Sequence, residues 1–208
     1  MRFAILKRRI FSYLPDIILQ PYKLLRLYNW YFKRGCSLPA PHFVKQAVLS
    51  RNAIKNSVWV ETGTYLGDTT KFLSERYPKV HTLEPSKYYR ELAKSLIKKS
   101  DNIVFHEGSS EECFADICKN LYGDISFWLD GHFSGGNTYK CKLETPIEYE
   151  LETIKKNKQN FSNICIFIDD IRCSFEEPDY PSLNYYVDWA KSLDLRWTIE
   201  HDIFIAKT

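Results

Sequence analysis

Acidic side chains follow several short apolar runs in this chain of 208 residues, and carboxylates placed in this way can bind cations or carry protons. They are Glu61, Glu84, Asp130 and the adjacent pair Asp169-Asp170. If the apolar runs are parallel strands, their carboxyl ends meet at one edge of a sheet, where such folds bind ligands. Left unpaired there, the carboxylates would repel one another and raise one another's pKa.

A turn with two glycines follows the first of these acids. The run Glu61-Thr62-Gly63-Thr64-Tyr65-Leu66-Gly67 places its glycines at a turn where the backbone can approach a ligand closely. It lacks the G-x-G-x-x-G pattern of dinucleotide-binding turns, and its acid would repel a pyrophosphate but suits an ammonium group. Taken alone, the spacing is equally typical of a plain tight turn.

Polar positions also follow the next two apolar runs. Glu84 ends the run Val80-His81-Thr82-Leu83-Glu84, at the place where ribose hydroxyls lie in doubly wound folds. Glu107-Gly108-Ser109-Ser110 ends the following run and offers a small polar loop to an adenine ring. A lone carboxylate at a strand end is usually a solvated cap, so the order of these positions is more informative than either one.

The three aspartates follow runs that we expect to be neighbouring strands. A divalent cation would offset their repulsion, and hard oxygen ligands suit Mg²⁺, with Ca²⁺ or Mn²⁺ as other occupants. His132 is the candidate general base, because imidazole titrates near neutral pH and this residue closely follows Asp130. The alternative interpretations of His132 are a hydrogen-bonded loop residue or one that orients a ligand.

The elements that must position these side chains alternate between short apolar runs and longer amphipathic ones. The expected strands are Ser57–Glu61, Val80–Glu84, Ile103–Glu107, Ile125–Asp130, Ile164–Asp169, Arg196–Glu200 and Ile203–Ala206. The expected helices are His42–Leu49, Thr69–Arg76, Lys87–Lys99, Glu111–Leu121, Lys142–Lys156 and Leu183–Ser192. This alternation predicts an α/β fold with a doubly wound, seven-stranded, mostly parallel sheet. Only His201-Asp202 separates the last two strands, which therefore form an antiparallel C-terminal hairpin.

Charge divides the chain into two parts. Residues 1–34 carry eight Lys and Arg against one acid, a net charge of +7, which leaves −4 on the rest because the whole chain carries +3. We expect a basic amphipathic helical extension over residues 1–37 and one domain over residues 38–208. The extension could cap the domain, lie on an anionic membrane surface or dock a partner.

Composition limits location and partners. The six cysteines form no C-x-x-C pair, so we expect reduced thiols and a cytoplasmic protein, peripheral to a membrane if the extension binds lipid. No apolar run approaches the roughly 20 residues that span a bilayer, and we identify no signal peptide. The net acidity of residues 35–208 argues against a nucleic-acid partner. Pairing of two chains into a homodimer stays open.

The order of these features resembles that of class I S-adenosylmethionine (SAM)-dependent methyltransferases. The acidic glycine loop, the acid after the second strand, the polar loop after the third and the terminal hairpin extend over roughly residues 57–208. The resemblance implies a Rossmann-like fold that binds SAM. The cofactor-binding residues it implies are Glu61, Gly63, Thr64, Tyr65, Gly67, Thr69, Thr70, Glu84, Pro85, Ser86, Gly108, Ser109, Ser110 and Asp130.

A narrower resemblance concerns the aspartates. An acid after the fourth strand and an Asp-Asp pair after the fifth is similar to the metal site of cation-dependent O-methyltransferases, which include catechol-type and sugar-modifying enzymes. This resemblance implies that Asp130, Asp169 and Asp170 bind Mg²⁺ or Mn²⁺, with Asp130 and His132 as the catalytic residues.

The sequence D-G-H-F-S-G-G at residues 130–136, followed by Glu144-Thr145-Pro146, resembles small methyltransferases among the glycan-assembly enzymes of bacteria and large viruses. It implies transfer of the methyl group of SAM to a hydroxyl of a sugar, in particular a deoxyhexose of a glycan or polysaccharide. Tyr180 would be available to stack on the sugar face. Two alternatives stay open: a catechol or phenol O-methyltransferase with the same site, and a SAM-binding module without catalysis.

Overall fold

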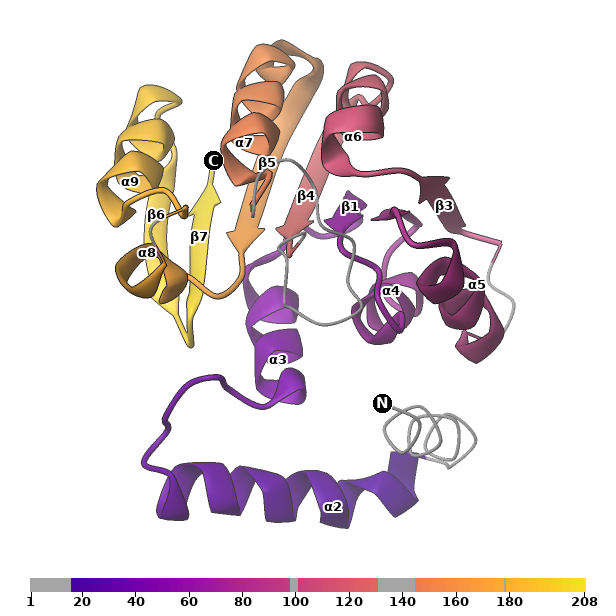
Figure 1. Cartoon of the computed structure of the whole chain (residues 1–208), viewed down its shortest axis with the longest axis vertical. Helices are drawn as coiled ribbons and strands as arrows, with labels where there is room; N and C mark the ends of the chain where they lie inside the picture. Colours follow the sequence, from indigo (N-terminus) through magenta and orange to yellow (C-terminus); the bar gives the residue numbers. More distant parts are fainter. Residues whose placement is uncertain (1–15, 98–100, 131–144, 178) are drawn as a thin grey trace.

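The computed structural model describes residues 16–97, 101–130, 145–177 and 179–208, which form a seven-stranded sheet with helices on both faces (Figure 1). The strands are β1 (Val58–Thr62), β2 (Lys79–Glu84), β3 (Ile103–Glu107), β4 (Gly123–Leu129), β5 (Phe161–Ile168), β6 (Arg196–Glu200) and β7 (Ile203–Lys207). Their order in the sheet is β3-β2-β1-β4-β5-β7-β6. The first five are parallel, and β7 runs antiparallel to β5 and β6. The predicted fold class is confirmed.

Two layers of helices bury the two faces of the sheet. The helices of the domain are α3 (His42–Asn52), α4 (Asp68–Ser74), α5 (Lys87–Leu96), α6 (Ser110–Lys119), α7 (Ile147–Lys156), α8 (Cys173–Glu176) and α9 (Leu183–Ser192), with a short 3₁₀ turn η2 (Lys158–Asn160). Buried side chains of α6, α7 and α9 pack with one face, and those of α3 and α4 pack with the other. Helices therefore shield both faces of the sheet from water, as parallel sheets require.

Alternation along the strands sorts side chains between these layers. On β4, Phe127 and Leu129 belong to the core under α6 and α7, whereas Trp128 belongs to the core under α3 and α4. On that second face, Trp59 of β1 stacks on Phe167 of β5 with ring centroids 5.6 Å apart. Successive side chains along a strand point to opposite faces of the sheet, and this alternation also decides to which face each acid at a strand end points.

Some element boundaries differ from the predicted ones. Strands β4 and β5 end one residue earlier than predicted, at Leu129 and Ile168, and begin earlier, at Gly123 and Phe161. Asp130 and Asp169 therefore lie just past the strands, where the alternation of side chains between the two faces of the sheet no longer fixes their direction. The helix predicted from Lys142 begins at Ile147, because Pro146 suits the N-terminal cap position, and residues 142–144 lie outside the described ranges.

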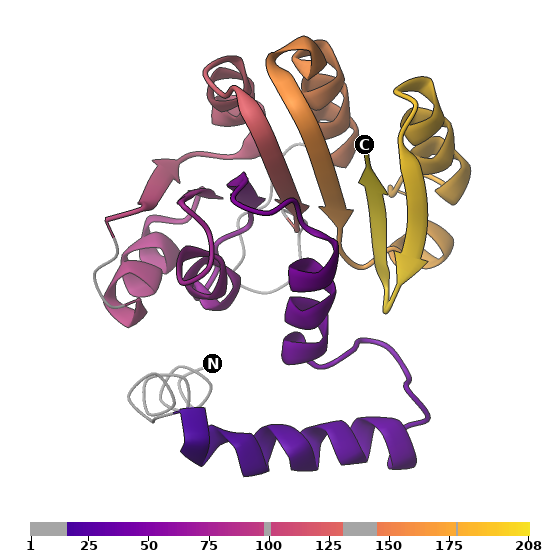
Figure 2. The same ribbon diagram turned by 180° about the vertical axis from the view of Figure 1, so that it is seen from behind.

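The N-terminal segment lies away from the sheet. Helix α2 (Asp16–Tyr28) continues into a short π-helix, η1 (Asn29–Lys33), and runs below α3 in both views (Figures 1 and 2). Trp30 of η1 is buried, with its ring 5.4 Å from that of His201 in the β6–β7 turn. The apolar side chains of α2 are largely exposed, so α2 does not cap the sheet. None of the helices in the described ranges is long and apolar enough to span a membrane.

Candidate functional site

The carboxyl ends of β1, β4 and β5 are held in register by backbone hydrogen bonds. The Asp130 N–H donates to the Thr62 carbonyl (3.3 Å) and lies 3.2 Å from the Thr62 hydroxyl. The Asp169 N–H donates to the carbonyl of Leu129 (3.1 Å). These contacts bring the predicted aspartates together at one edge of the sheet, as the sequence indicated.

Glu61 is buried inside the sheet edge and is held by threonines. Its Oε2 accepts hydrogen bonds from the hydroxyls of Thr70 (2.5 Å) and Thr82 (2.7 Å), and the residue is 1% exposed. Burial raises the pKa of Glu61 to about 7, while the two hydroxyls act in the opposite direction. A buried carboxylate held by neutral donors is a favourable site for a cationic group, because an added positive charge would offset its desolvation.

The glycine loop between β1 and α4 needs its glycines. The backbone is left-handed at Gly63 (φ 86°) and at Gly67 (φ 77°), and a Cβ at Gly67 would lie 2.7 Å from Cδ1 of Ile97. The N–H groups of Gly63 and Thr64 both donate to the carbonyl of Leu83 at 3.1 Å, which ties the loop to β2. The turn is thus fixed against the end of the neighbouring strand.

Glu84 closes this loop from the end of β2. Its two carboxylate oxygens accept hydrogen bonds from the backbone N–H groups of Tyr65 (2.8 Å) and Ser86 (2.9 Å). Burial raises the pKa of Glu84, and the two N–H donors lower it. Each carboxylate oxygen has a second acceptor direction, so a fixed carboxylate of this kind can also accept from vicinal hydroxyls.

The remaining predicted cofactor positions lie around the same loop or start helices. Thr69 pairs with His42 at 3.0 Å, between the hydroxyl and Nε2, and so connects α4 to α3. Ser109 forms a capping box with Glu112 at the start of α6, its N–H donating to the Glu112 carboxylate at 2.8 Å. The loop after β3 is therefore held by the N-terminal cap of α6, and the chain turns into this cap at Gly108 (φ 143°).

A buried acid that the sequence analysis missed lies beside this loop. Glu150 of α7 is 1% exposed and accepts a hydrogen bond from the hydroxyl of Ser110 at 2.5 Å. Burial raises its pKa to about 7, while hydrogen bonds from Ser110 and Thr62 lower it. Its place in the first turn of an amphipathic helix is typical of a solvent-exposed cap, so the local sequence gave no sign of burial.

A lysine occupies the aspartate cluster. The Nζ of Lys45, on α3, lies 2.6 Å from both carboxylate oxygens of Asp169 and 3.1 Å from Oδ1 of Asp170. Burial lowers the pKa of Lys45, but the charges of Asp169 and Asp170, with a smaller contribution from Asp130, outweigh burial and raise it. Lys45 is therefore an ammonium at neutral pH, and it was absent from the predicted site.

A second cation pairs with Asp170 and Asp202. Nη1 of Arg172 donates to Oδ1 of Asp170 (2.7 Å) and pairs with the buried carboxylate of Asp202. Burial and the nearby Asp169 raise the pKa of Asp130, which Lys45 lowers. Lys45 and Arg172 together place two positive charges among the aspartates that end β4 and β5.

The described carboxylates fit a divalent cation poorly in this arrangement. An ion bound to Asp169 at the oxygen distance of about 2 Å that Mg²⁺ requires would share both oxygens with the Lys45 ammonium. Two cations on one carboxylate repel each other strongly in a buried site. Within residues 16–97, 101–130, 145–177 and 179–208, no three His, Cys, Asp or Glu side chains are grouped to hold a metal ion.

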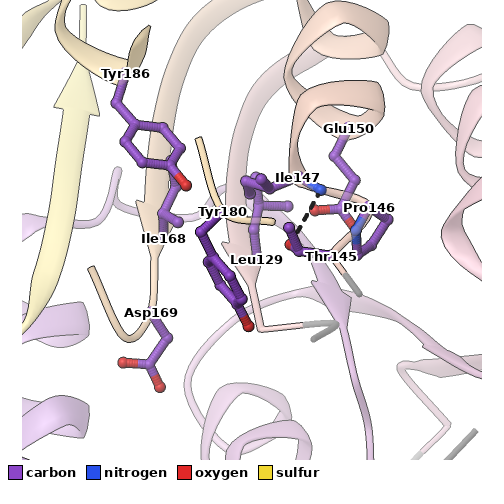
Figure 3. Close-up of a pocket in the computed structure, with 9 residues that line it drawn as sticks. All are labelled: Leu129, Thr145, Pro146, Ile147, Glu150, Ile168, Asp169, Tyr180 and Tyr186. Carbon is purple, nitrogen blue, oxygen red and sulfur yellow. Dashed lines mark hydrogen bonds between the residues drawn. The ribbon is translucent and has the colours of Figure 1, made fainter. Parts of the chain in front are cut away.

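A recess lies beside the aspartates, between the ends of β4 and β5 and the start of α7 (Figure 3). It is shallow and opens to solvent. Its lining combines apolar, aromatic and acidic side chains: Leu129, Thr145, Pro146, Ile147, Glu150, Ile168, Asp169, Tyr180 and Tyr186. Tyr180, predicted as a stacking residue, is part of this wall. His132, the predicted base, lies outside the described ranges.

Solved structures share this architecture. A candidate rRNA methylase of Clostridium thermocellum superposes with a TM-score of 0.51 at 13% identity, over 82% of this chain and 97% of that one. The chain has the Rossmann-like methyltransferase fold. A candidate methyltransferase of Streptococcus mutans in complex with SAH gives 0.49 at 17% identity, over 82% and 98% of the two chains. SAM-bound fibrillarin of Aeropyrum pernix gives 0.49 at 10%, over 79% and 73%. No protein-family model and no curated protein sequence matches the chain.

The burial of Glu61 predicts a pH-dependent stability. Its raised pKa means that the folded state keeps a proton which the unfolded chain releases near pH 4.3, so its stabilising contribution is lost as pH rises towards about 7. Glu61→Gln should remove this loss and raise the free energy of unfolding at pH 8 by on the order of 2 kcal/mol, with little change at pH 5.

Urea denaturation of Glu61→Gln and the native chain at pH 5, 6, 7 and 8 measures this difference. Glu75→Gln, at an exposed position of the neighbouring helix end, is the matched control and should give no pH-dependent difference. A gain for Glu61→Gln that is equal at all four pH values would contradict the assignment.

Proposed function

We propose that this chain is a SAM-dependent methyltransferase whose acceptor is a hydroxyl of a sugar, in particular a deoxyhexose of a glycan or polysaccharide. The observation that carries the SAM part is the pair of buried carboxylates, Glu61 and Glu84, at successive strand ends around a loop with left-handed backbone at Gly63 and Gly67. Rossmann-like folds bind nucleosides at this edge of the sheet.

Each part of SAM has a chemically suited group at this edge. Glu61 offers a desolvated carboxylate to the ammonium of the methionine end, and Glu84 offers carboxylate oxygens oriented by two backbone N–H groups to the ribose hydroxyls. The Ser109–Ser110 turn would border the adenine. This assignment leaves the sulfonium directed towards the ends of β4 and β5.

The acceptor would enter the recess beside Asp169. Its lining of apolar, aromatic and acidic side chains is the combination that a sugar ring requires. Tyr180 supports this choice, because an aromatic face packs on the apolar face of a sugar while nearby acids accept from its hydroxyls.

The chemistry is a displacement at the methyl carbon. The acceptor oxygen forms a bond to that carbon as the carbon–sulfur bond breaks, and the bonding pair remains on sulfur, which becomes a neutral thioether. The hydroxyl proton must pass to a base, for which His132 and Asp130 are the candidates. The described residues give no support to a divalent cation in this step, and the proposal does not depend on one.

The SAM assignment predicts the effect of removing Glu84. Isothermal titration calorimetry should show one SAM molecule per chain, and Glu84→Ala should weaken SAM binding at least about tenfold, because two ribose hydroxyls lose a charged acceptor. Glu75→Ala, an exposed acid of the same charge, should leave the affinity unchanged. Absence of SAM binding by the native chain would reject the proposed function.

The acceptor assignment predicts transfer of a labelled methyl group from SAM to methyl glycosides of deoxyhexoses, followed by mass spectrometry of the product. Tyr180→Ala should raise the acceptor KM without changing SAM affinity, since the ring contacts the acceptor alone. Transfer to catechol in preference to all glycosides would favour the phenol alternative. SAM binding without transfer to any acceptor would favour a non-catalytic module.

A further inference from the structure

The positive charge that pairs with the aspartate cluster comes from side chains of this protein. Lys45 is a buried residue of α3, separated by 124 positions from Asp169, yet its ammonium contacts both oxygens of that carboxylate. An ammonium carries three hydrogen-bond donors, and the three contacts to Asp169 and Asp170 use all of them. The contact is a specific bidentate arrangement, unlike a loose surface pair.

The position of Lys45 is fixed by its helix. Val48 and Leu49, one turn further along α3, are each 1% exposed and pack in the core with Trp128 and Phe167. This packing fixes the rotation of α3 about its axis, and the spacing of one turn directs Lys45 towards the same face of the sheet. The ammonium is thereby presented to the strand ends by the hydrophobic core.

Two cations of the chain already pair with the carboxylates of this cluster. Lys45 contacts Asp169 and Asp170, and Arg172 contacts Asp170 and Asp202. A divalent ion bound to Asp169 or Asp170 would therefore lie beside an ammonium or a guanidinium, which would repel it.

We propose that the Lys45 ammonium is the resident cation of this carboxylate site and excludes divalent metal ions from it. The proposal rests on the proposed function only in naming the site as the place of methyl transfer. Lys45 is then a positioning residue, which holds Asp169 and Asp170 in place where cation-dependent enzymes would use a metal. Methyl transfer by this chain requires no added metal.

The test uses Mn²⁺ alone as the probe, followed by electron paramagnetic resonance of the free ion and by equilibrium dialysis. The native chain should bind no stoichiometric Mn²⁺. Lys45→Ala should expose the carboxylates and bind one Mn²⁺ at least about tenfold more tightly than the native chain, and adding Asp169→Asn should abolish that gain. Lys71→Ala, a lysine on the exposed side of α4, is the matched control and should behave as the native chain.

Stoichiometric Mn²⁺ binding by the native chain that Asp169→Asn abolishes would overturn the proposal, whether or not the Lys45 variants fold. Lys45→Met, which keeps an apolar stem of similar length, replaces Lys45→Ala if the latter is unstable. If both variants fold and neither binds Mn²⁺ more tightly than the native chain, the proposal is also overturned. SAM titration of the native chain tests the proposed function and does not depend on Mn²⁺ binding, so the two proposals can fail independently of each other.

A different observation concerns the N-terminal segment. Large apolar side chains are exposed along α2 and η1: Ile18, Leu24, Leu25, Leu27, Tyr28, Tyr31 and Phe32 are each at least 38% exposed. We call these residues the α2 apolar surface. A row of exposed large apolar groups on one short segment marks an interaction site.

The cations of the segment border the apolar side of the helix. At about 100° per residue, the exposed apolar residues of α2 occupy one half of the helix circumference, with Lys23 and Arg26 in the other half and Lys33 and Arg34 following. Trp30, the buried residue of η1, is the contact with the domain. The apolar side therefore faces away from the domain, flanked by positive charge.

We infer that the α2 apolar surface lies on an anionic lipid surface. Apolar side chains that enter the acyl boundary while flanking Lys and Arg meet the headgroups are the defining pattern of interfacial helices. Charge complementarity selects this occupant, because Asp16 is the sole acid among residues 1–34. The inference is independent of the reaction that the domain performs.

Sedimentation with vesicles tests this inference on the full chain. Vesicles of phosphatidylcholine with roughly 30% phosphatidylglycerol should carry the chain into the pellet, and pure phosphatidylcholine should retain much less. Leu24→Asp with Leu25→Asp should abolish pelleting, whereas Tyr122→Asp, at an exposed site in the domain, should not. An unbound native chain, or a dimer in sedimentation velocity that the Leu24/Leu25 changes dissociate, would overturn it.

Discussion

Carboxylates at the ends of β1, β2 and β5 are buried along one edge of the sheet, and each needs a partner that offsets the free-energy cost of its burial. Parallel pairing creates this constraint, because it brings the ends of successive strands together. The partners differ in kind: threonine hydroxyls for Glu61, backbone N–H groups for Glu84 and an ammonium for Asp169.

These differences divide the edge into two regions. Glu61 is held by neutral donors, and its raised pKa shows that its charge is incompletely compensated, so a cationic ligand group is favoured there. Asp169 is already paired with Lys45 and leaves less attraction for another cation. The edge therefore favours the positively charged cofactor at β1 and β2 and leaves the β4 and β5 ends for the acceptor.

Helix α3 links the two inferences drawn for the molecule. It carries Lys45 into the carboxylate cluster, and it follows directly after the segment that bears the α2 apolar surface. In Figure 1 the arrowheads of β4 and β5 point towards α3, with α2 beyond it. The site edge of the sheet and the N-terminal segment thus lie on the same side of the molecule.

The sequence by itself determined a doubly wound, mostly parallel sheet, its terminal hairpin, the glycine loop and the gathering of Glu61, Glu84, Asp130 and Asp169 at one edge. These features follow from local rules: hydrophobic period, turn residues and the handedness of crossovers. Tertiary structure alone decided that Lys45 pairs with Asp169, that Glu150 is buried and that α2 leaves its apolar side exposed. The physical reason is that Lys and Glu on amphipathic helices have the same local sequence signature whether they face water or a distant strand end, and the packing of each helix against the sheet settles which they face.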